Sequence, residues 1–157
     1  MPLRLPLPIY KFPPTIMNFN DLRKYCNENN NIPTDENEQY IPFSYINEAE
    51  ERFIVIWSSP KMLTKISSKF TSHIATYKLN WNEYPVFVSG ISTPTGVFFQ
   101  TYMALSSHED TTAWSYIFKF HKSVIGTYPK FCMADGAWEI TNAVKDIMGK
   151  YTTIVVC

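Results

Sequence analysis

Polar and apolar positions alternate through the middle of the chain and predict a run of β-strands. Residues 72–81 (SHIATYKLNW) place side chains alternately on two faces, as in a half-buried strand. The stretches 83–92 and 97–107 have the same character, and the turn TPTG at 93–96 joins them. Three consecutive strands with short connections predict an antiparallel meander.

The hydrophobic period changes after residue 107. Apolar residues of the stretch 107–126 fall on one stripe of a helix, and Gly126 is a typical end for such a helix. Ser107 and Asp110, three residues apart, fit a capping box at its beginning. A long amphipathic helix is therefore predicted to follow the three strands.

The remaining sequence predicts two further strands separated by a helix. Residues 130–134 form a short apolar strand, 138–148 repeat apolar residues at helical spacing, and 151–157 (YTTIVVC) form a final strand. The order from residue 70 onward is βββαβαβ. This order matches the ribonuclease-H-like fold, an α/β class with a mixed sheet, and residues 70–157 correspond to a core of this fold that is truncated at its C-terminus.

The first part of the chain predicts an extension to that core. Residues 1–17 contain five prolines and predict an extended lead-in. Residues 18–69 predict a short helix, a polar loop over 32–51, a strand over 52–59 and a helix over 60–69 that begins with proline.

Composition and charge narrow the class of protein. The 157 residues are 45% hydrophobic, with 14 basic and 14 acidic residues, so the strong positive field of an autonomous nucleic-acid-binding protein is absent. No apolar run is long enough to predict a membrane span. The three cysteines, Cys26, Cys132 and Cys157, are odd in number and far apart, which favours reduced thiols and an intracellular location.

Four blocks of sequence resemble a known family. The segments RFIVIWSSPKML, ATYKLN, SSHEDTTAW and ADGAWEITNAV are similar, in this order, to blocks of the Mutator-like element (MULE) transposase domain. The resemblance covers roughly residues 50–157, and the first 49 residues lie outside it. It implies a ribonuclease-H-like core that cuts and rejoins DNA at transposon ends, in the nucleus.

The resemblance also implies a set of catalytic residues. The family holds two Mg²⁺ or Mn²⁺ ions with an Asp-Asp-Glu set, because several carboxylates are needed to neutralise and share two cations. Asp135 matches the second carboxylate, whereas Ile74 stands at the first position. The third would lie past residue 157. Cys157 matches the first half of the family's Cys-x-x-His pair, and its His is missing.

The same residues also have simpler interpretations. Asp135 precedes Gly136, and Asp-Gly is a common turn and helix-capping pair. His73 lies beside Ile74, but imidazole is a poor ligand for Mg²⁺. His121 is interpreted as a core residue of the long helix and His108 as a surface loop residue. Asp110 and its neighbour Glu109 are interpreted as stabilising a helix N-terminus.

Three functional hypotheses follow. In the first, the chain is a fragment or domesticated descendant of a MULE-type transposase that lacks catalytic activity and binds DNA or a protein, with no cation held tightly. In the second, it is a truncated piece of an active two-metal nuclease and strand transferase. In the third, it is a protein-interaction module. The oligomeric state and the DNA target stay open.

Overall fold

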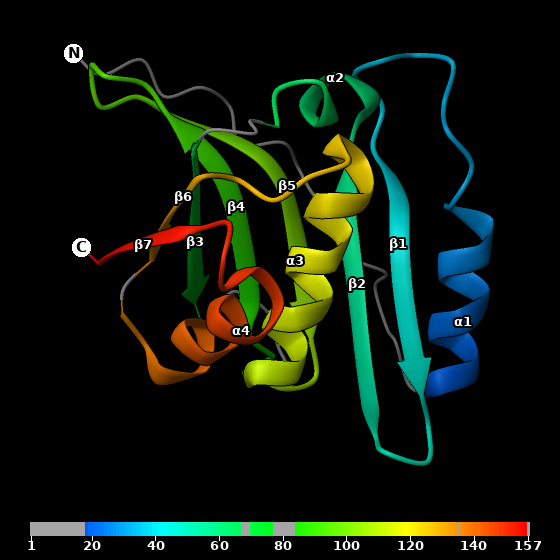
Figure 1. The fold of residues 1–157 in the computed structure, drawn as a ribbon. Coiled ribbons are helices and arrows are strands. Elements are labelled where there is room, and N and C mark those ends of the chain that lie inside the picture. The colour runs from blue at the N-terminus through cyan, green and yellow to red at the C-terminus, as the bar shows by residue number, and fades with distance from the viewer. Residues whose placement is uncertain (1–17, 67–69, 77–83, 135, 157) are drawn as a thin grey trace.

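The computed structural model describes residues 18–66, 70–76, 84–134 and 136–156. Within these ranges the chain forms four helices and seven strands (Figure 1). Their order is α1 (Phe19–Glu28), β1 (Tyr40–Asn47), β2 (Arg52–Ser58), α2 (Pro60–Leu63), β3 (Phe70–Thr76), β4 (Val86–Ser92), β5 (Phe98–Ser106), α3 (Thr111–Ile125), β6 (Phe131–Ala134), α4 (Trp138–Met148) and β7 (Thr153–Val156).

The strands form one mixed sheet in the order β1-β2-β5-β4-β3-β6-β7. Strands β3, β4 and β5 pair antiparallel, as the meander predicts, although residues 77–83 of the first two predicted strands lie outside the described residues. Strand β6 runs parallel to β3, and β7 runs parallel to β6. The predicted order of elements from residue 70 onward and the predicted strand directions are therefore confirmed.

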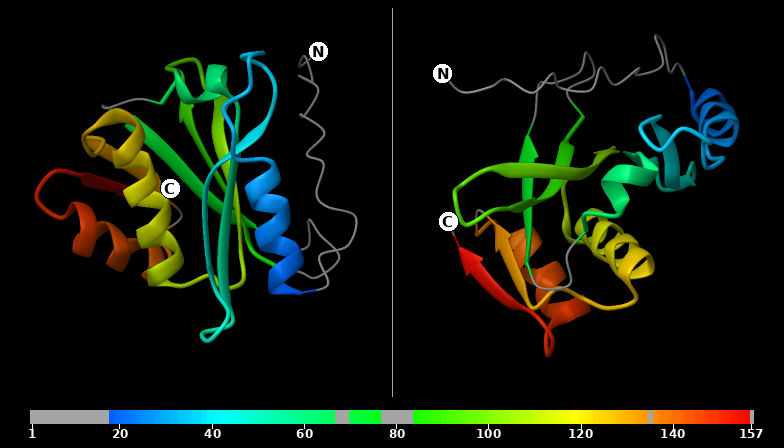
Figure 2. Two further views of the ribbon diagram at one scale, coloured as in Figure 1. Left: turned by 90° about the vertical axis from the view of Figure 1, so that its right-hand side faces the viewer. Right: turned by 90° about the horizontal axis from the view of Figure 1, so that it is seen from above.

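Helices cover both faces of the sheet (Figure 2). On one face, α3 and α4 bury a large apolar core against β2, β4, β5 and β6, built around residues such as Trp114, Phe118 and Ile140. On the other face, α1 buries a smaller core through Leu22 and Cys26. Each sheet face is apolar where a helix covers it, as expected for a layered α/β domain. No helix in the described ranges has the length and apolar character needed to span a bilayer.

The loop predicted over residues 32–51 is wrong for part of its length. Residues 40–47 form β1, which pairs antiparallel with β2, and β2 continues the sheet through β5. Pro42 interrupts the strand pattern, and the pairing register shifts between Tyr40 and Phe43 at this point. Proline lacks an N–H donor and is tolerated in an edge strand or a bulge, which is where β1 places it.

Two predicted helix boundaries also change. The N-cap of α3 is Asp110 itself, whose side chain accepts a hydrogen bond from the Ala113 N–H, so Ser107 does not begin the helix. Gly126 ends α3 in the left-handed region at φ 78°, as predicted. The helix predicted over 60–69 is observed only as the four residues of α2, a turn follows to Ile66, and 67–69 lie outside the described residues.

Candidate functional site

The candidate site predicted from the sequence involves one residue of β3 and the residue that follows β6 in sequence. These strands are neighbours and parallel, and their register pairs Ser72 with Met133. Ile74 and Asp135 each follow that pair by two residues in sequence. The backbone of Ile74 pairs with Val88 of β4. The Ile74 side chain, Asp135 and Cys157 lie outside the described residues, so their predicted roles stay predictions.

The described side chains include no cluster of metal-ligand residues. Across residues 18–66, 70–76, 84–134 and 136–156, no three His, Cys, Asp or Glu side chains come together in a group that could hold a metal ion. Cys26 and Cys132 are buried free thiols. Burial raises the pKa of the Cys132 thiol to about 12, so this group stays protonated and is a poor metal ligand.

A buried polar cluster lies beside this region, on the sheet face that α3 covers. The Nδ1 atom of His73 lies 2.6 Å from the Ser89 hydroxyl, and its Nε2 atom lies 3.1 Å from the Thr71 hydroxyl. The hydroxyl of Tyr102 lies 3.4 Å from Nδ1 of His121. These five residues come from β3, β4, β5 and α3, so the cluster joins three strands to the helix.

Burial decides the chemistry of the cluster. His73 is only 1% exposed, and desolvation, followed by the nearby His121, lowers its pKa well below the usual value. Ser89 is equally buried, so a substrate cannot reach the Ser89–His73 pair for nucleophilic attack. Burial also raises the pKa of Tyr102. This effect is larger than that of the hydrogen bond with Ser89, which lowers the pKa. The cluster is a hydrogen-bonded part of the core.

Each of the three histidines has a distinct environment in the structure. Both ring nitrogens of His73 already have hydroxyl partners, which gives this residue a structural role in place of the metal-ligand role considered from the sequence. His121 is buried on the core side of α3, and His108 is exposed in the loop before it, as predicted. In the sequence, this cluster was indicated by His121, a polar residue within the apolar stripe of the predicted helix.

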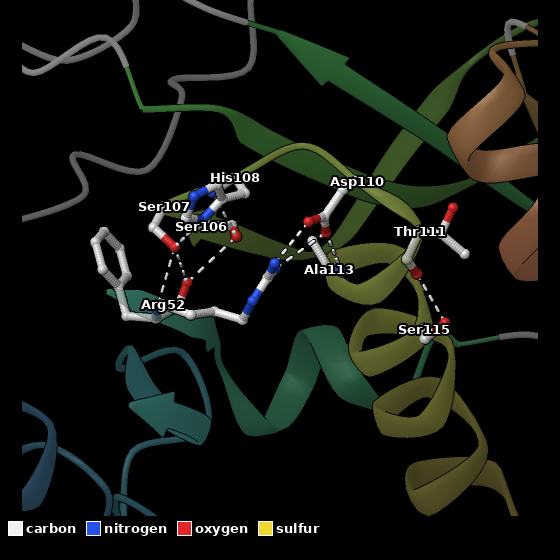
Figure 3. Close-up of polar contacts among 9 residues, drawn as sticks. Arg52, Ser106, Ser107, His108, Asp110, Thr111, Ala113 and Ser115 are labelled. Carbon is white, nitrogen blue, oxygen red and sulfur yellow. Dashed lines mark hydrogen bonds and ion pairs between the residues drawn. The ribbon is translucent and has the colours of Figure 1, made fainter. Parts of the chain in front are cut away.

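A second polar cluster surrounds the beginning of α3 (Figure 3). Arg52 donates two hydrogen bonds to the Asp110 carboxylate, at 2.6 and 3.0 Å. Ser107 accepts a hydrogen bond from the Phe53 N–H at 3.0 Å and lies 2.8 Å from Nδ1 of His108. Ser106 donates to the Phe53 carbonyl. These contacts tie the loop between β5 and α3 to the start of β2.

The Arg52–Asp110 pair changes the ionisation of both partners. Burial alone would raise the pKa of Asp110, but hydrogen bonds from Arg52 and from the Ala113 N–H outweigh it and lower the pKa. The hydrogen bond with Asp110 raises the pKa of Arg52. The prediction that Asp110 stabilises a helix N-terminus is confirmed, and sequence reasoning missed its partner 58 residues earlier.

One large aromatic side chain is exposed close to the predicted carboxylate in sequence. Trp138, the first residue of α4, follows Asp135 by three residues and is 72% exposed. Trp57 and Trp114 are buried in the two cores. Exposed tryptophan is unusual on a protein surface and provides a flat apolar face for a ligand or partner.

Comparisons with known proteins give one structural likeness. No family model matches the sequence, and no curated protein matches it. A search of solved structures finds a chain of the simian T-cell lymphotropic virus intasome in complex with PP2A regulatory subunit B56 gamma. The TM-score is 0.40 and the sequence identity 13%, and the match covers 59% of this chain and 33% of that chain. A likeness of this size carries no functional argument.

Proposed function

We propose that this chain contains a ribonuclease-H-like core of the MULE transposase lineage that binds DNA and does not cut it. The observation that carries the proposal is the strand order β5-β4-β3-β6-β7, with β6 and β7 parallel to β3. An antiparallel meander followed by two parallel strands, with helices α3 and α4 as crossovers, is the arrangement that the sequence resemblance implies. The finer assignment rests on the four resembling blocks of sequence.

The lack of catalysis rests on the residue at the first carboxylate position. Ile74 occupies the position where the resemblance implies an Asp, and the strand that holds it is the neighbour of β6, which leads to Asp135. An isoleucine offers a metal neither a ligand nor a compensating charge. A two-metal reaction needs both, because two divalent cations bring four positive charges into one pocket.

The proposed setting follows from the same resemblance. A DNA-binding descendant of a transposase acts in the nucleus, and transposon ends or sequences derived from them are its targets. Binding through the DNA backbone needs no metal, only positively charged and hydrogen-bonding groups on the protein surface. Mg²⁺ or Mn²⁺ would be required under the second hypothesis, in which the chain is part of an active nuclease and strand transferase.

A protein-interaction module is a second candidate, favoured by a separate observation. Phe131 of β6 and Val155 of β7 are exposed large apolar residues of neighbouring strands, and Tyr151 and Trp138 are exposed nearby in sequence. Contiguous exposed apolar side chains are typical of protein interfaces, and Phe131 and Val155 lie on paired strands. This candidate predicts a protein partner and no affinity for DNA.

Two measurements on the purified chain test the proposal. Fluorescence anisotropy with a labelled DNA duplex of random sequence, in low-salt buffer, measures binding, and conversion of supercoiled plasmid in Mg²⁺ or Mn²⁺ measures nicking. Saturable DNA binding without nicking is the expected result. Metal-dependent nicking that Asp135→Ala abolishes would favour the active enzyme. Absence of DNA binding would overturn the proposal and favour the interaction module.

A further inference from the structure

Three exposed lysines lie on the outer side of α3 and in the loop after it. Lys119 and Lys122 are one turn apart on the solvent side of α3, and Lys130 precedes β6; all three are exposed. Lys119 lies 5.7 Å from the ring centre of Tyr116, and Lys122 lies 4.8 Å from that of Tyr128. We define Tyr116, Lys119, Lys122, Tyr128 and Lys130 as the lysine face; Lys130 follows Tyr128 by two residues in sequence.

The lysine face has an unbalanced positive charge. Residues 111–134 contain three lysines and no Asp or Glu, although acidic and basic residues are equal in number over the whole chain. Four ion pairs occur among the described residues, and they join basic residues of α1, β2 and α2 to carboxylates. No ion pair joins a lysine of the lysine face to another described residue.

Glu50 and Arg52 act on the tyrosine at one end of the lysine face, and tyrosine rings contact its two helix lysines. Burial is the largest cause that raises the pKa of Tyr116, followed by its hydrogen bond with Tyr45. Glu50 adds to the rise and Arg52 opposes it, so these two charges counteract one another at this residue. Further along α3 the two lysines have aromatic partners in place of carboxylates. A tyrosine ring attracts an ammonium group but leaves its formal charge in place.

We infer that the lysine face contacts the phosphate backbone of duplex DNA. The inference rests on the DNA binding proposed above and names the surface responsible. Lysine ammonium groups are compact charges that bind phosphates without reading sequence. Lys119 and Lys122 are separated by about 4.5 Å along the helix axis, so a row of regularly repeated charges can meet both at once. The tyrosine contacts hold the lysine stems on the surface and reduce the entropy lost on binding.

The place of the lysine face in the fold separates it from the predicted carboxylate. The carboxyl half of α3, drawn in yellow, lies at the end of the sheet opposite to the carboxyl ends of β3 and β6 (Figure 1). Contacts at the lysine face would therefore position DNA on the protein. They require neither Asp135 nor a metal ion. Binding there is expected to be insensitive to sequence and strongly sensitive to salt.

The test compares two triple variants that lose the same charge. Lys119→Gln with Lys122→Gln and Lys130→Gln removes the lysine face. The matched control, Lys24→Gln with Lys145→Gln and Lys150→Gln, removes three exposed lysines elsewhere, and Lys145 occupies the last turn of α4 as Lys122 does in α3. Affinity for a random-sequence duplex is measured over a range of salt concentrations, with circular dichroism to check folding.

The expected result is a loss of about tenfold or more in DNA affinity at low salt for the lysine-face variant only. Its slope of log affinity against log salt should be shallower by about 0.9 for each lysine that contacts a phosphate. Equal losses in both variants, or none, would overturn the inference while leaving DNA binding itself intact. A wild-type chain that fails to bind DNA would overturn the proposed function as well, and binding only to vesicles of anionic phospholipid would assign the lysine face to a membrane.

Discussion

Arg52 and Asp110 are 58 residues apart in sequence and form a two-point ion pair at the beginning of α3. The guanidinium holds both carboxylate oxygens, and one of these oxygens also accepts the Ala113 N–H. A single carboxylate thus caps the helix and fixes it to the first residue of β2. Because Arg52 is mostly buried, the pair is less screened than an ordinary surface ion pair.

Substitution of Asp110 should separate these two functions. Asp110→Asn keeps an oxygen for the cap and loses the charge, whereas Asp110→Ala loses both. We expect the alanine variant to be less stable than the asparagine variant by about 1 kcal/mol, the usual contribution of an N-cap side chain. Urea unfolding of the two variants and the wild type measures the difference. Equal free energies of unfolding for the two variants would show that the cap contributes nothing here.

Three glycines should respond differently to alanine. Gly126 and Gly96 have φ near 80° with nothing within 4 Å of an added Cβ, so each Gly→Ala change is expected to cost about 1 kcal/mol through backbone conformation alone. An added Cβ at Gly90 would collide with the Phe99 carbonyl oxygen and the Phe98 ring. Gly90→Ala should therefore cost more, about 2–3 kcal/mol, because backbone must move.

Thermal and urea unfolding of the three single variants check this order. Gly96→Ala is the control for Gly126→Ala, since both positions have the same conformational demand and open surroundings. Comparable losses at Gly90 and at the two turn glycines would contradict the expected collision.

Stability should fall in mild acid because His73 cannot be protonated in its buried site. Its pKa in the folded chain is well below that of the unfolded chain, so the unfolded state binds more protons between the two values. Stability is therefore complete above about pH 6.5 and decreases as the pH falls below it. The expected slope is about 1.4 kcal/mol per pH unit for one histidine.

Two measurements test the histidine prediction. NMR titration of the wild-type chain should show the His73 ring shifts staying constant through the usual pKa of histidine until the chain unfolds. Urea unfolding between pH 5 and pH 7.5, a range set around that pKa, should give a shallower pH dependence for His73→Gln than for His108→Gln. A His73 resonance that titrates in the folded chain would contradict the buried, neutral assignment.

The sequence predicted the core of the fold because local pattern and topology agree there. The alternation that begins at residue 72 corresponds to β3 in the described residues, and the change of period after 107 corresponds to the step from β5 to α3. Strand β1 was missed because Pro42 breaks its pattern, and only the hairpin partner β2 supplies the pairing that makes it a strand. Such pairing depends on tertiary structure, which periodicity does not contain.

Polar contacts between residues far apart in the chain could not be predicted from the sequence either. The partners of His73 lie two residues away in Thr71 and sixteen residues away in Ser89, and they meet because β3 and β4 pair in one register. Sequence spacing gives no sign of that register. Asp110 as a helix cap was predictable from its local sequence, whereas its bond with Arg52 was not, because β2 is brought to α3 by its pairing with β5.

The last prediction concerns metal binding at the candidate carboxylate. Asp135 alone offers one oxygen-bearing side chain, whereas Mg²⁺ sites in nucleic-acid enzymes share several carboxylates and substrate phosphates. Isothermal titration calorimetry of the wild-type chain with Mg²⁺ or Mn²⁺ should therefore give binding weaker than ~10⁻³ M, the affinity of the weakest multi-ligand calcium sites. Ile74→Asp should strengthen binding slightly, because it adds a carboxylate to the strand next to β6.

Ile74→Asn is the matched control, since asparagine has the size of aspartate without its charge. Both variants should remain inactive on plasmid DNA, because a second carboxylate supplies one more ligand and one more compensating charge, while a two-metal reaction needs a larger set. Stoichiometric, tight binding of Mn²⁺ by the wild-type chain, lost in Asp135→Asn, would show that a metal centre exists at this position. The other ligands of that centre would then have to come from outside the described residues. The active-enzyme hypothesis would replace the DNA-binding one.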